Sequence, residues 1–195
     1  MNLSFKQYRA IDLTILGIIL LVSEFVTATA AAKWFPGQLY ALSPTITVVC
    51  IVMMRWNGYA AIHALLGGFA YCFASGAQEK QIIVYCVGNC FALAALALFK
   101  AMGKEKIRST FYFTLLFVLA AFFGAELGRW LIGLAFGEAF DSIVTFLLSD
   151  LITLIFTVVV VLITRRVDGL FEDQKSYLIR TEEERRKAEA EKYYK

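Results

Sequence analysis

Few charged or amide side chains interrupt the long apolar stretches of this 195-residue sequence, and most of those that do lie at one depth. Counting inward at about 1.5 Å per helical residue places them about 12–15 Å from the ends of the stretches that hold them. This predicted polar layer consists of Glu24, Asn89, Glu126, Arg129 and Asp150. A charge removed from water is costly, so each of these groups needs a partner or a function.

Two interpretations of the polar layer are open. Glu126 and Arg129 are three residues apart on one helix face and can neutralise each other, while the other groups hydrogen-bond between helices as structural links. That pairing leaves Glu24 and Asp150 without a cation. We therefore favour a solute cavity lined by the polar layer, and the surplus of acidic groups favours an amine or another cationic group in the solute.

Two tryptophans lie near the mouth of this expected cavity. Trp130 follows Arg129 directly, where its ring can stack on a planar ligand or cover a cation. Trp34 begins the first outer loop. Tryptophan also favours a membrane surface for reasons of solvation alone, but we include both residues in the predicted substrate site.

Other kinds of chemistry lack the residues they need. The single histidine, His63, has no serine or cysteine nucleophile of known geometry, and the sequence has no HExxH helix or phosphate-binding glycine loop. Cys86 and Cys90 are one turn apart, but no second Cys/His pair completes a metal site. A net charge of +3, spread over short loops, does not favour nucleic acid as a partner. The sequence thus predicts neither an enzyme nor a metal or cofactor site.

Composition points to a membrane protein. The chain is 59% hydrophobic and 18% charged, with a mean hydropathy of +0.67, which excludes a soluble enzyme or a disordered chain. A bilayer core of about 30 Å is crossed by about 20 helical residues. We predict an all-α fold with six transmembrane helices, at Ile11–Ala32, Leu39–Met54, Tyr59–Ser75, Gln81–Phe99, Thr110–Phe136 and Ser142–Thr164. The second and third are short, and a re-entrant pair is the alternative.

Basic residues predict the orientation, because Lys and Arg accumulate in cytoplasmic loops. With the N-terminus inside, the outer loops receive only Lys33 and Lys80. The inner side receives nine basic residues before the tail: Lys6, Arg9, Arg55, Lys100, Lys104, Lys106, Arg108, Arg165 and Arg166. We therefore expect a multi-pass protein of the cell membrane with both termini in the cytoplasm.

The C-terminal end has a different composition. Residues 1–166 form the predicted six-span domain, and residues 167–195 form a charged cytoplasmic helical tail with seven basic and eight acidic residues. Glu182–Arg186 and Glu183–Lys187 have the spacing of stabilising pairs on one helix face. The tail either extends into solvent without a specific role or docks through an apolar side made of Leu170, Phe171, Tyr177 and Leu178.

A transporter needs an energy source, and this chain has neither a nucleotide-binding motif nor an evident inverted repeat. We therefore expect it to work with another subunit. Ala60, Ala64 and Gly68 repeat every four residues along the third predicted span, and small residues let helices approach closely. This stripe either contacts a partner or packs within the chain.

The stretch from Trp56-Asn57-Gly58 through Leu66-Gly67-Gly68 to Ala74-Ser75-Gly76 is similar to the glycine-rich third-span region of one transporter family. Together with the six spans, the cytoplasmic termini and the polar layer, it makes residues 1–166 resemble the substrate-binding S-components of energy-coupling factor (ECF) transporters. Many members carry an Ala-xxx-Ala contact motif in the inner part of the first span. Here Ala28 and Ala32 lie at its outer end.

The resemblance implies the substrate-binding subunit of an ATP-driven importer that captures a small, polar-aromatic, vitamin-like solute from outside. It implies a lid at Trp34-Phe35-Pro36-Gly37, and a coupling membrane subunit and cytoplasmic ATPases as partners. The alternative is a structural or regulatory membrane subunit that works through its charged tail.

Overall fold

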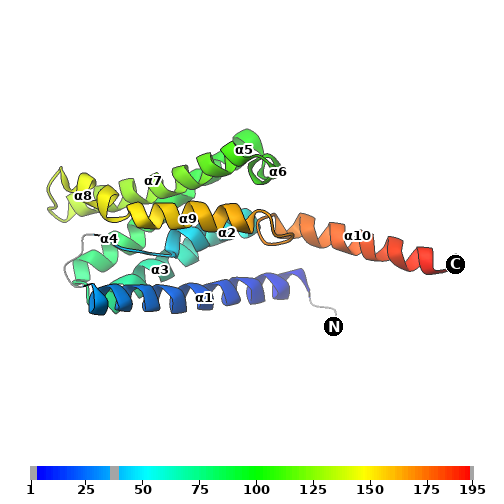
Figure 1. The fold of residues 1–195 in the computed structure, drawn as a ribbon, viewed down its shortest axis with the longest axis horizontal. Helices are drawn as coiled ribbons and strands as arrows, with labels where there is room; N and C mark the ends of the chain where they lie inside the picture. Colours follow the sequence, from blue (N-terminus) through cyan, green and yellow to red (C-terminus); the bar gives the residue numbers. More distant parts are fainter. Residues whose placement is uncertain (1–3, 36–39, 194–195) are drawn as a thin grey trace.

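The computed structural model describes residues 4–35 and 40–193, and each regular element in these two ranges is a helix (Figure 1). The elements are α1 (Phe5–Trp34), α2 (Thr45–Trp56), the 3₁₀ helix η1 (Asn57–Tyr59), α3 (Ala60–Ser75), α4 (Glu79–Asn89), the 3₁₀ helix η2 (Cys90–Leu96), α5 (Ala97–Met102), α6 (Lys104–Ser109), α7 (Phe111–Ala135), α8 (Ser142–Ser149), α9 (Leu151–Thr164) and α10 (Gln174–Tyr193). The all-α fold predicted from the sequence is confirmed for these ranges.

Several helical stretches have the length and apolar character needed to cross a membrane. By length and composition alone, four continuous stretches of described residues qualify, although one of them, Thr45–Ser75, turns back on itself; α8 with α9 makes a fifth if the pair is counted as one span bent by 44°. These stretches are Phe5–Trp34, Thr45–Ser75, Glu79–Met102 and Phe111–Ala135. The chain therefore has the helices that a membrane protein requires.

The stretch Thr45–Ser75 is a helical hairpin. Asn57 adopts a positive φ of 54°, which ends α2, and the chain turns back through η1 into α3. The two arms are so close that a Cβ atom on Gly67 would overlap the side chain of Thr45. Glycine is required at this contact because any side chain would force α2 and α3 apart. α3 lies within the predicted third span, whereas α2 starts later than the predicted second span and continues two residues beyond its predicted end at Met54.

The predicted boundaries were wrong at two places. The second span was expected to begin at Leu39, which lies outside the described residues, but Tyr40–Pro44 is not helical and α2 begins only at Thr45. The last span was expected to be one helix, but it is broken at Asp150. In both places the polar side chains and backbone groups make contacts that a straight helix would not allow.

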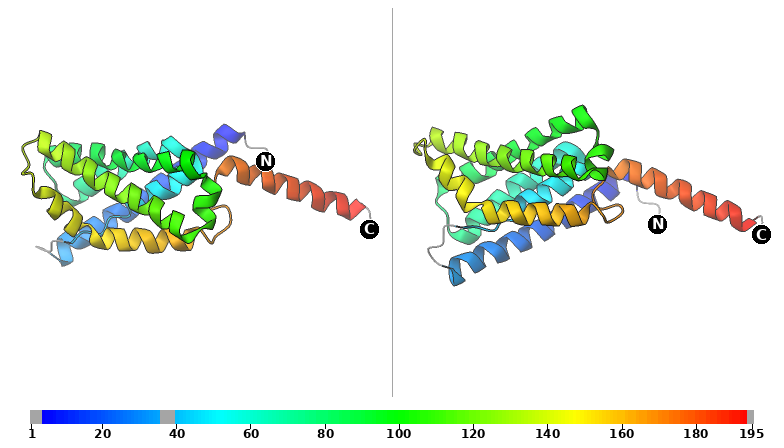
Figure 2. Two further views of the ribbon diagram at one scale, coloured as in Figure 1. Left: turned by 90° about the horizontal axis from the view of Figure 1, so that it is seen from above. Right: turned by 45° about the horizontal axis from the view of Figure 1, so that its top comes forward.

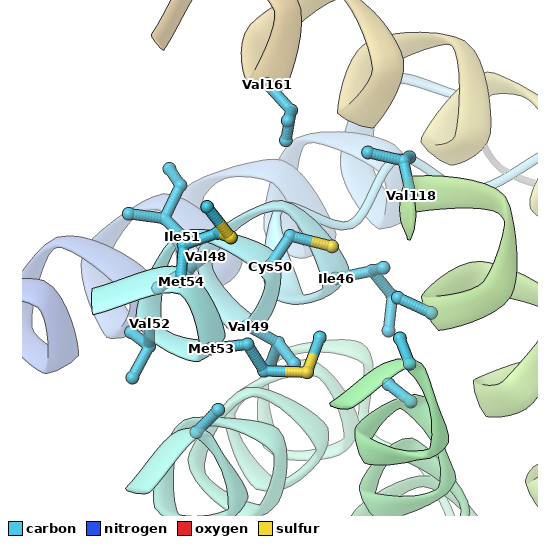
Figure 3. Close-up of a cluster of buried hydrophobic side chains, with 14 of the residues drawn as sticks. Ile46, Val48, Val49, Cys50, Ile51, Val52, Met53, Met54, Val118 and Val161 are labelled. Atoms are coloured by element: carbon cyan, nitrogen blue, oxygen red, sulfur yellow. The ribbon is translucent and has the colours of Figure 1, made fainter. Parts of the chain in front are cut away.

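Helix α2 forms the centre of the molecule. All 12 of its residues are buried, as expected for a helix that is apolar on every side. Figure 3 shows its side chains pointing outward in several directions, towards Val118 of α7 and Val161 of α9 among others. The outer helices expose large apolar side chains such as Val22 and Phe73, a surface that fits contact with lipid.

The stripe Ala60, Ala64 and Gly68 packs inside the chain. Ala60 and Ala64 have no exposed surface, and a Cβ on Gly68 would lie 2.8 Å from the backbone of Tyr85 and Cys86 in α4. Of the two roles expected for this stripe, contact with a partner or packing within the chain, the structure shows packing within the chain. It leaves the stripe no free surface for a second subunit.

Helix α10 projects away from the bundle, beyond the N-terminal end of α1 and the C-terminal end of α9 (Figures 1 and 2). It begins at Gln174, so the expectation of one helix from residue 167 was wrong. The preceding residues turn back onto the bundle, where Phe171 is fully buried with its ring 6.3 Å from that of Phe117. Further along the helix, Arg186 contacts Glu182 at 3.2 Å, as predicted.

An electrostatic clasp holds the base of this arm. Arg55 at the end of α2 makes two bonds to Asp12 of α1 and donates to the carbonyl oxygens of Gly169 and Leu170. Further ionic contacts join α6 to the segment before α10: Lys104 with Asp173, Arg108 with Asp168, and Arg108 with Glu172. The chain from 168 to 174 is therefore part of the packed bundle, and the free part of α10 starts beyond it.

Candidate functional site

Arg129 on α7 is the centre of the polar layer, and its side chain is 2% exposed. Its Nε donates to Oδ1 of Asn89 over 2.9 Å, and its Nη1 forms an ion pair with Asp150. The same nitrogen lies 3.0 Å from Oε1 of Glu126, an ionic contact outside hydrogen-bond geometry. Four of the five predicted residues are thus brought together from α4, α7 and the α8–α9 junction.

Local structure explains how these side chains meet. Gly88 precedes Asn89, and a Cβ at Gly88 would lie 2.6 Å from the backbone nitrogen of Arg129. The missing side chain lets α4 and α7 approach closely enough for Asn89 to reach the guanidinium group. Directly after Asn89 the helix tightens into η2, and Asp150 occupies the break between α8 and α9. The cluster therefore lies at two irregular points of the helices, the junction of α4 with η2 and the break between α8 and α9.

Glu24 belongs to a different part of the site. Its Oε2 accepts hydrogen bonds from the hydroxyls of Ser43 (2.8 Å) and Thr45 (2.7 Å), and all three side chains are buried. Thr45 is the first residue of α2, and a carboxylate is favourable at a helix N-terminus. Glu24 thus holds the two hydroxyls at the start of α2 from the neighbouring helix α1, and the Ser43 hydroxyl in turn accepts from the Thr45 nitrogen over 3.3 Å. Its other oxygen, Oε1, has no hydrogen-bond partner among the described residues.

The chain between residues 40 and 45 runs extended past the α8–α9 break. The Ala41 nitrogen donates to the Ser149 carbonyl oxygen over 2.9 Å. The Thr153 hydroxyl accepts from the Ser43 nitrogen over 2.9 Å and donates to the Ala41 carbonyl oxygen over 3.0 Å. Non-helical backbone at membrane depth is tolerated when its polar groups are satisfied in this way. This segment links Glu24 on one side to the Asp150 junction on the other.

A cavity of about 440 Å³ opens at the turn between α3 and α4. Its lining consists of Tyr71, Ser75, Gly76, Ala77, Gln78, Gln81 and Tyr85. The rings of Tyr71 and Tyr85 are stacked with centroids 4.8 Å apart, and the guanidinium carbon of Arg129 lies 4.9 Å from the centroid of Tyr85. Tyr85 therefore lies between the cavity and the charged cluster.

The two predicted tryptophans are not joined to this cluster by the contacts they make. Trp34 is 75% exposed at the end of α1. Trp130 donates from Nε1 to the carbonyl oxygen of Phe140 over 2.9 Å and packs edge-to-face on its ring. Trp130 thus fastens the α7–α8 connection. Of the expected lid, Pro36 and Gly37 lie outside the described residues.

Sequence reasoning missed the cavity lining and the start of α2. Tyr71 and Tyr85 are uncharged at neutral pH, and Gln78 and Gln81 lie outside or at the end of a predicted span, so a search for charged and amide groups deep in the spans passed over them. For the start of α2 a signal was present: Ser43-Pro44-Thr45 is a typical helix start, with hydroxyls before the first turn and proline beside them. It fell inside an apolar stretch that was assigned to a span.

In chemical terms, the site offers a hydrogen-bonding cavity backed by a buried ion network. Among the residues that the structure describes, no three His, Cys, Asp or Glu side chains are grouped as a metal site requires. Comparisons with protein-family models, with curated proteins and with solved structures find no match to this chain.

Proposed function

We propose that this chain is a six-span membrane protein that captures a small solute from outside the cell and acts as the substrate-binding subunit of an ATP-driven importer. The observation that carries the proposal is the cavity at the α3–α4 turn, whose wall residue Tyr85 contacts the Arg129 cluster. A polar cavity above a buried, preorganised ion network is the arrangement expected of a solute site within a membrane.

The distribution of charge supports an outward-facing cavity. Arg55, Lys104 and Arg108 gather at one end of the bundle, together with the base of α10. The α2–α3 hairpin turns at this same end, so the far end of α3, which carries the cavity, lies at the opposite one. Because basic residues favour the cytoplasmic side, we assign both termini to the cytoplasm and the cavity to the outer half of the membrane.

The importer role rests on the resemblance of residues 1–166 to S-components and on the lack of a nucleotide-binding motif in the sequence. A coupling membrane subunit and cytoplasmic ATPases would supply the energy. The stripe on α3 is buried, so a coupling subunit would contact another surface. The exposed apolar side chains of α1, which include Ile15 and Ile18, are accessible from the bilayer.

Native mass spectrometry of the gently purified protein tests the proposal. We expect a bound metabolite, and we expect Tyr71→Ala to weaken its binding by about 5- to 150-fold, because one stacking contact and one hydrogen bond are together worth about 1–3 kcal/mol. Phe73→Ala is the matched control, since Phe73 is an exposed aromatic residue on the same helix, outside the cavity lining. A protein that is empty and gains no stability from any small solute would contradict the proposal.

A structural or regulatory subunit working through α10 is the second candidate. The observation that favours it is the projection of α10 beyond a clasped base (Figure 2). Deleting residues 182–195 keeps the clasp and removes most of the free arm. If the protein is a solute binder, its ligand affinity stays unchanged; if the arm is the working part, co-purifying protein partners are lost.

A further inference from the structure

We infer that the solute held by the α3–α4 cavity is neutral, flat and rich in hydrogen-bonding groups. The inference rests on the proposed function and adds the chemical class of the ligand. It differs from the expectation of a cationic solute, which followed from the surplus of acidic residues in the polar layer.

The charge of the lining is the first argument. Among the described residues, the side chains that line the cavity carry no carboxylate, ammonium, guanidinium or imidazole group. A charged solute would lose part of its hydration in such a site without gaining an opposite charge, which is unfavourable. A neutral solute avoids this cost.

The acidic groups of the polar layer are not available to the cavity. Asp150 is 4% exposed and paired with Arg129, and Glu126 is 1% exposed beside the same guanidinium group. Glu24 is fully buried under the first turn of α2. These three acidic side chains therefore contact other groups inside the protein, Arg129 or the hydroxyls at the start of α2. They do not line the surface that a solute would contact.

The shape of the wall is the second argument. Tyr71 and Tyr85 both line the cavity, and their rings stack on each other with an angle of 29° between them. The cation of Arg129 lies on Tyr85 and draws electron density towards itself. Because the Tyr85 ring is covered by Tyr71 and Arg129, the ring edges are what a ligand can contact, and an aromatic edge favours the face of a planar ring system over a branched aliphatic group.

The hydrogen-bonding groups are the third argument. Oε1 of Gln81 already accepts from the Gln78 nitrogen over 3.1 Å, which leaves the Gln81 amide NH₂ as a donor to a ligand. The amide of Gln78 and the hydroxyls of Tyr71 and Tyr85 supply both donors and acceptors. A cavity of about 440 Å³ lies within the usual range for one small molecule.

Charge-sorted metabolites test this inference and identify the ligand in the same experiment. A deproteinised cell extract is separated by ion exchange into neutral, anionic and cationic pools, and each pool is added to the purified full-length protein. We expect the neutral pool alone to raise the melting temperature, by about 5–10 °C when the ligand is at one hundred times its dissociation constant. Mass spectrometry of the protein recovered from that pool then identifies the ligand, which should contain an aromatic ring.

A charge placed in the wall provides a second readout. Gln81→Glu is nearly isosteric and should lower the affinity for the captured solute at least about tenfold, since it sets an unpaired carboxylate against a neutral ligand. Glu79→Gln, two residues away and outside the lining, is the control and should leave the affinity unchanged.

The outcomes separate the two proposals. Stabilisation by the anionic or cationic pool, or tighter binding by Gln81→Glu, overturns the neutral class and leaves the solute-binding function standing. A neutral ligand without an aromatic ring overturns the flat shape. If no pool stabilises the protein and none leaves a bound molecule, the proposed function itself fails.

Discussion

Replacement of Arg129 by methionine is the most direct perturbation of the buried ion network. Arg129 contributes the guanidinium group that faces both Glu126 and Asp150, and all three side chains are at most 6% exposed. Methionine keeps much of the length and apolar volume of the arginine stem, so the change removes charge and hydrogen bonds more than it removes packing.

The expected cost follows from the groups left behind. In Arg129→Met, two buried carboxylates lose their cation, and breaking a buried pair in this way costs about 3–5 kcal/mol. The loss of the Arg129 Nε bond to Asn89 acts in the same direction. For a chain of this length about 2–4 °C of melting temperature corresponds to each kcal/mol, so we expect a fall of about 6–20 °C.

Thermal unfolding in detergent, followed by size-exclusion chromatography of the heated samples, measures this fall. The triple variant Arg129→Met, Glu126→Gln, Asp150→Asn removes the charges together and should recover most of the lost stability, because neutral replacement of a whole buried network is often tolerated. Arg185→Met is the control, since Arg185 is exposed on α10 and should leave the melting temperature unchanged.

Two results would refute the reasoning. If Arg129→Met melts within about 2 °C of the unchanged protein, less than the shift expected for 1 kcal/mol, the ion network does not stabilise the fold. If the triple variant is no more stable than Arg129→Met, stranded carboxylates are not the cause of the loss, and the packing of the arginine stem is the better explanation.

Two further predictions concern the α4–α7 contact and the clasp. Gly88→Ala should cost about 1–3 kcal/mol through overpacking, because its Cβ would meet the α7 backbone, whereas Gly58→Ala, with nothing within 4 Å, should be neutral in the same thermal assay. Burial acts to raise the pKa of Asp173, but Lys104 together with the backbone N–H groups of Ser176 and Lys175 more than offsets it, so that pKa lies below its ordinary 3.8. The clasp should therefore lose stability as the pH falls from about 4 through the folded-state pKa, a loss that melting curves should find absent in Asp173→Asn.

The helices could be predicted from sequence because their signals are local. Apolar length and the spacing of charges depend on residues that are neighbours in the chain, and α3 and α7 begin and end within a few residues of the predicted spans. The pairing of Glu126 with Arg129 is local in the same sense, since three residues along a helix bring them to one face.

The start of α2 could not be predicted from hydropathy. Residues 40–44 carry no charged side chain, so composition assigned them to a span, but their backbone bonds go to Ser149 and Thr153, more than one hundred residues away in the chain. Such contacts depend on which helices are neighbours. One sequence carries no direct information about that.

The sequence by itself determined that the chain is helical and apolar, and it marked Glu24, Asn89, Glu126, Arg129 and Asp150 as polar groups that the helices bury, because the cost of removing charge from water depends on residue type and position alone. The tertiary structure decided how those groups are divided. In the folded chain Glu24 accepts a hydrogen bond from Thr45 at the start of α2, and Asp150 pairs with Arg129. Tyr71 and Tyr85 line the cavity instead. Those pairings depend on distances across helices that only packing sets.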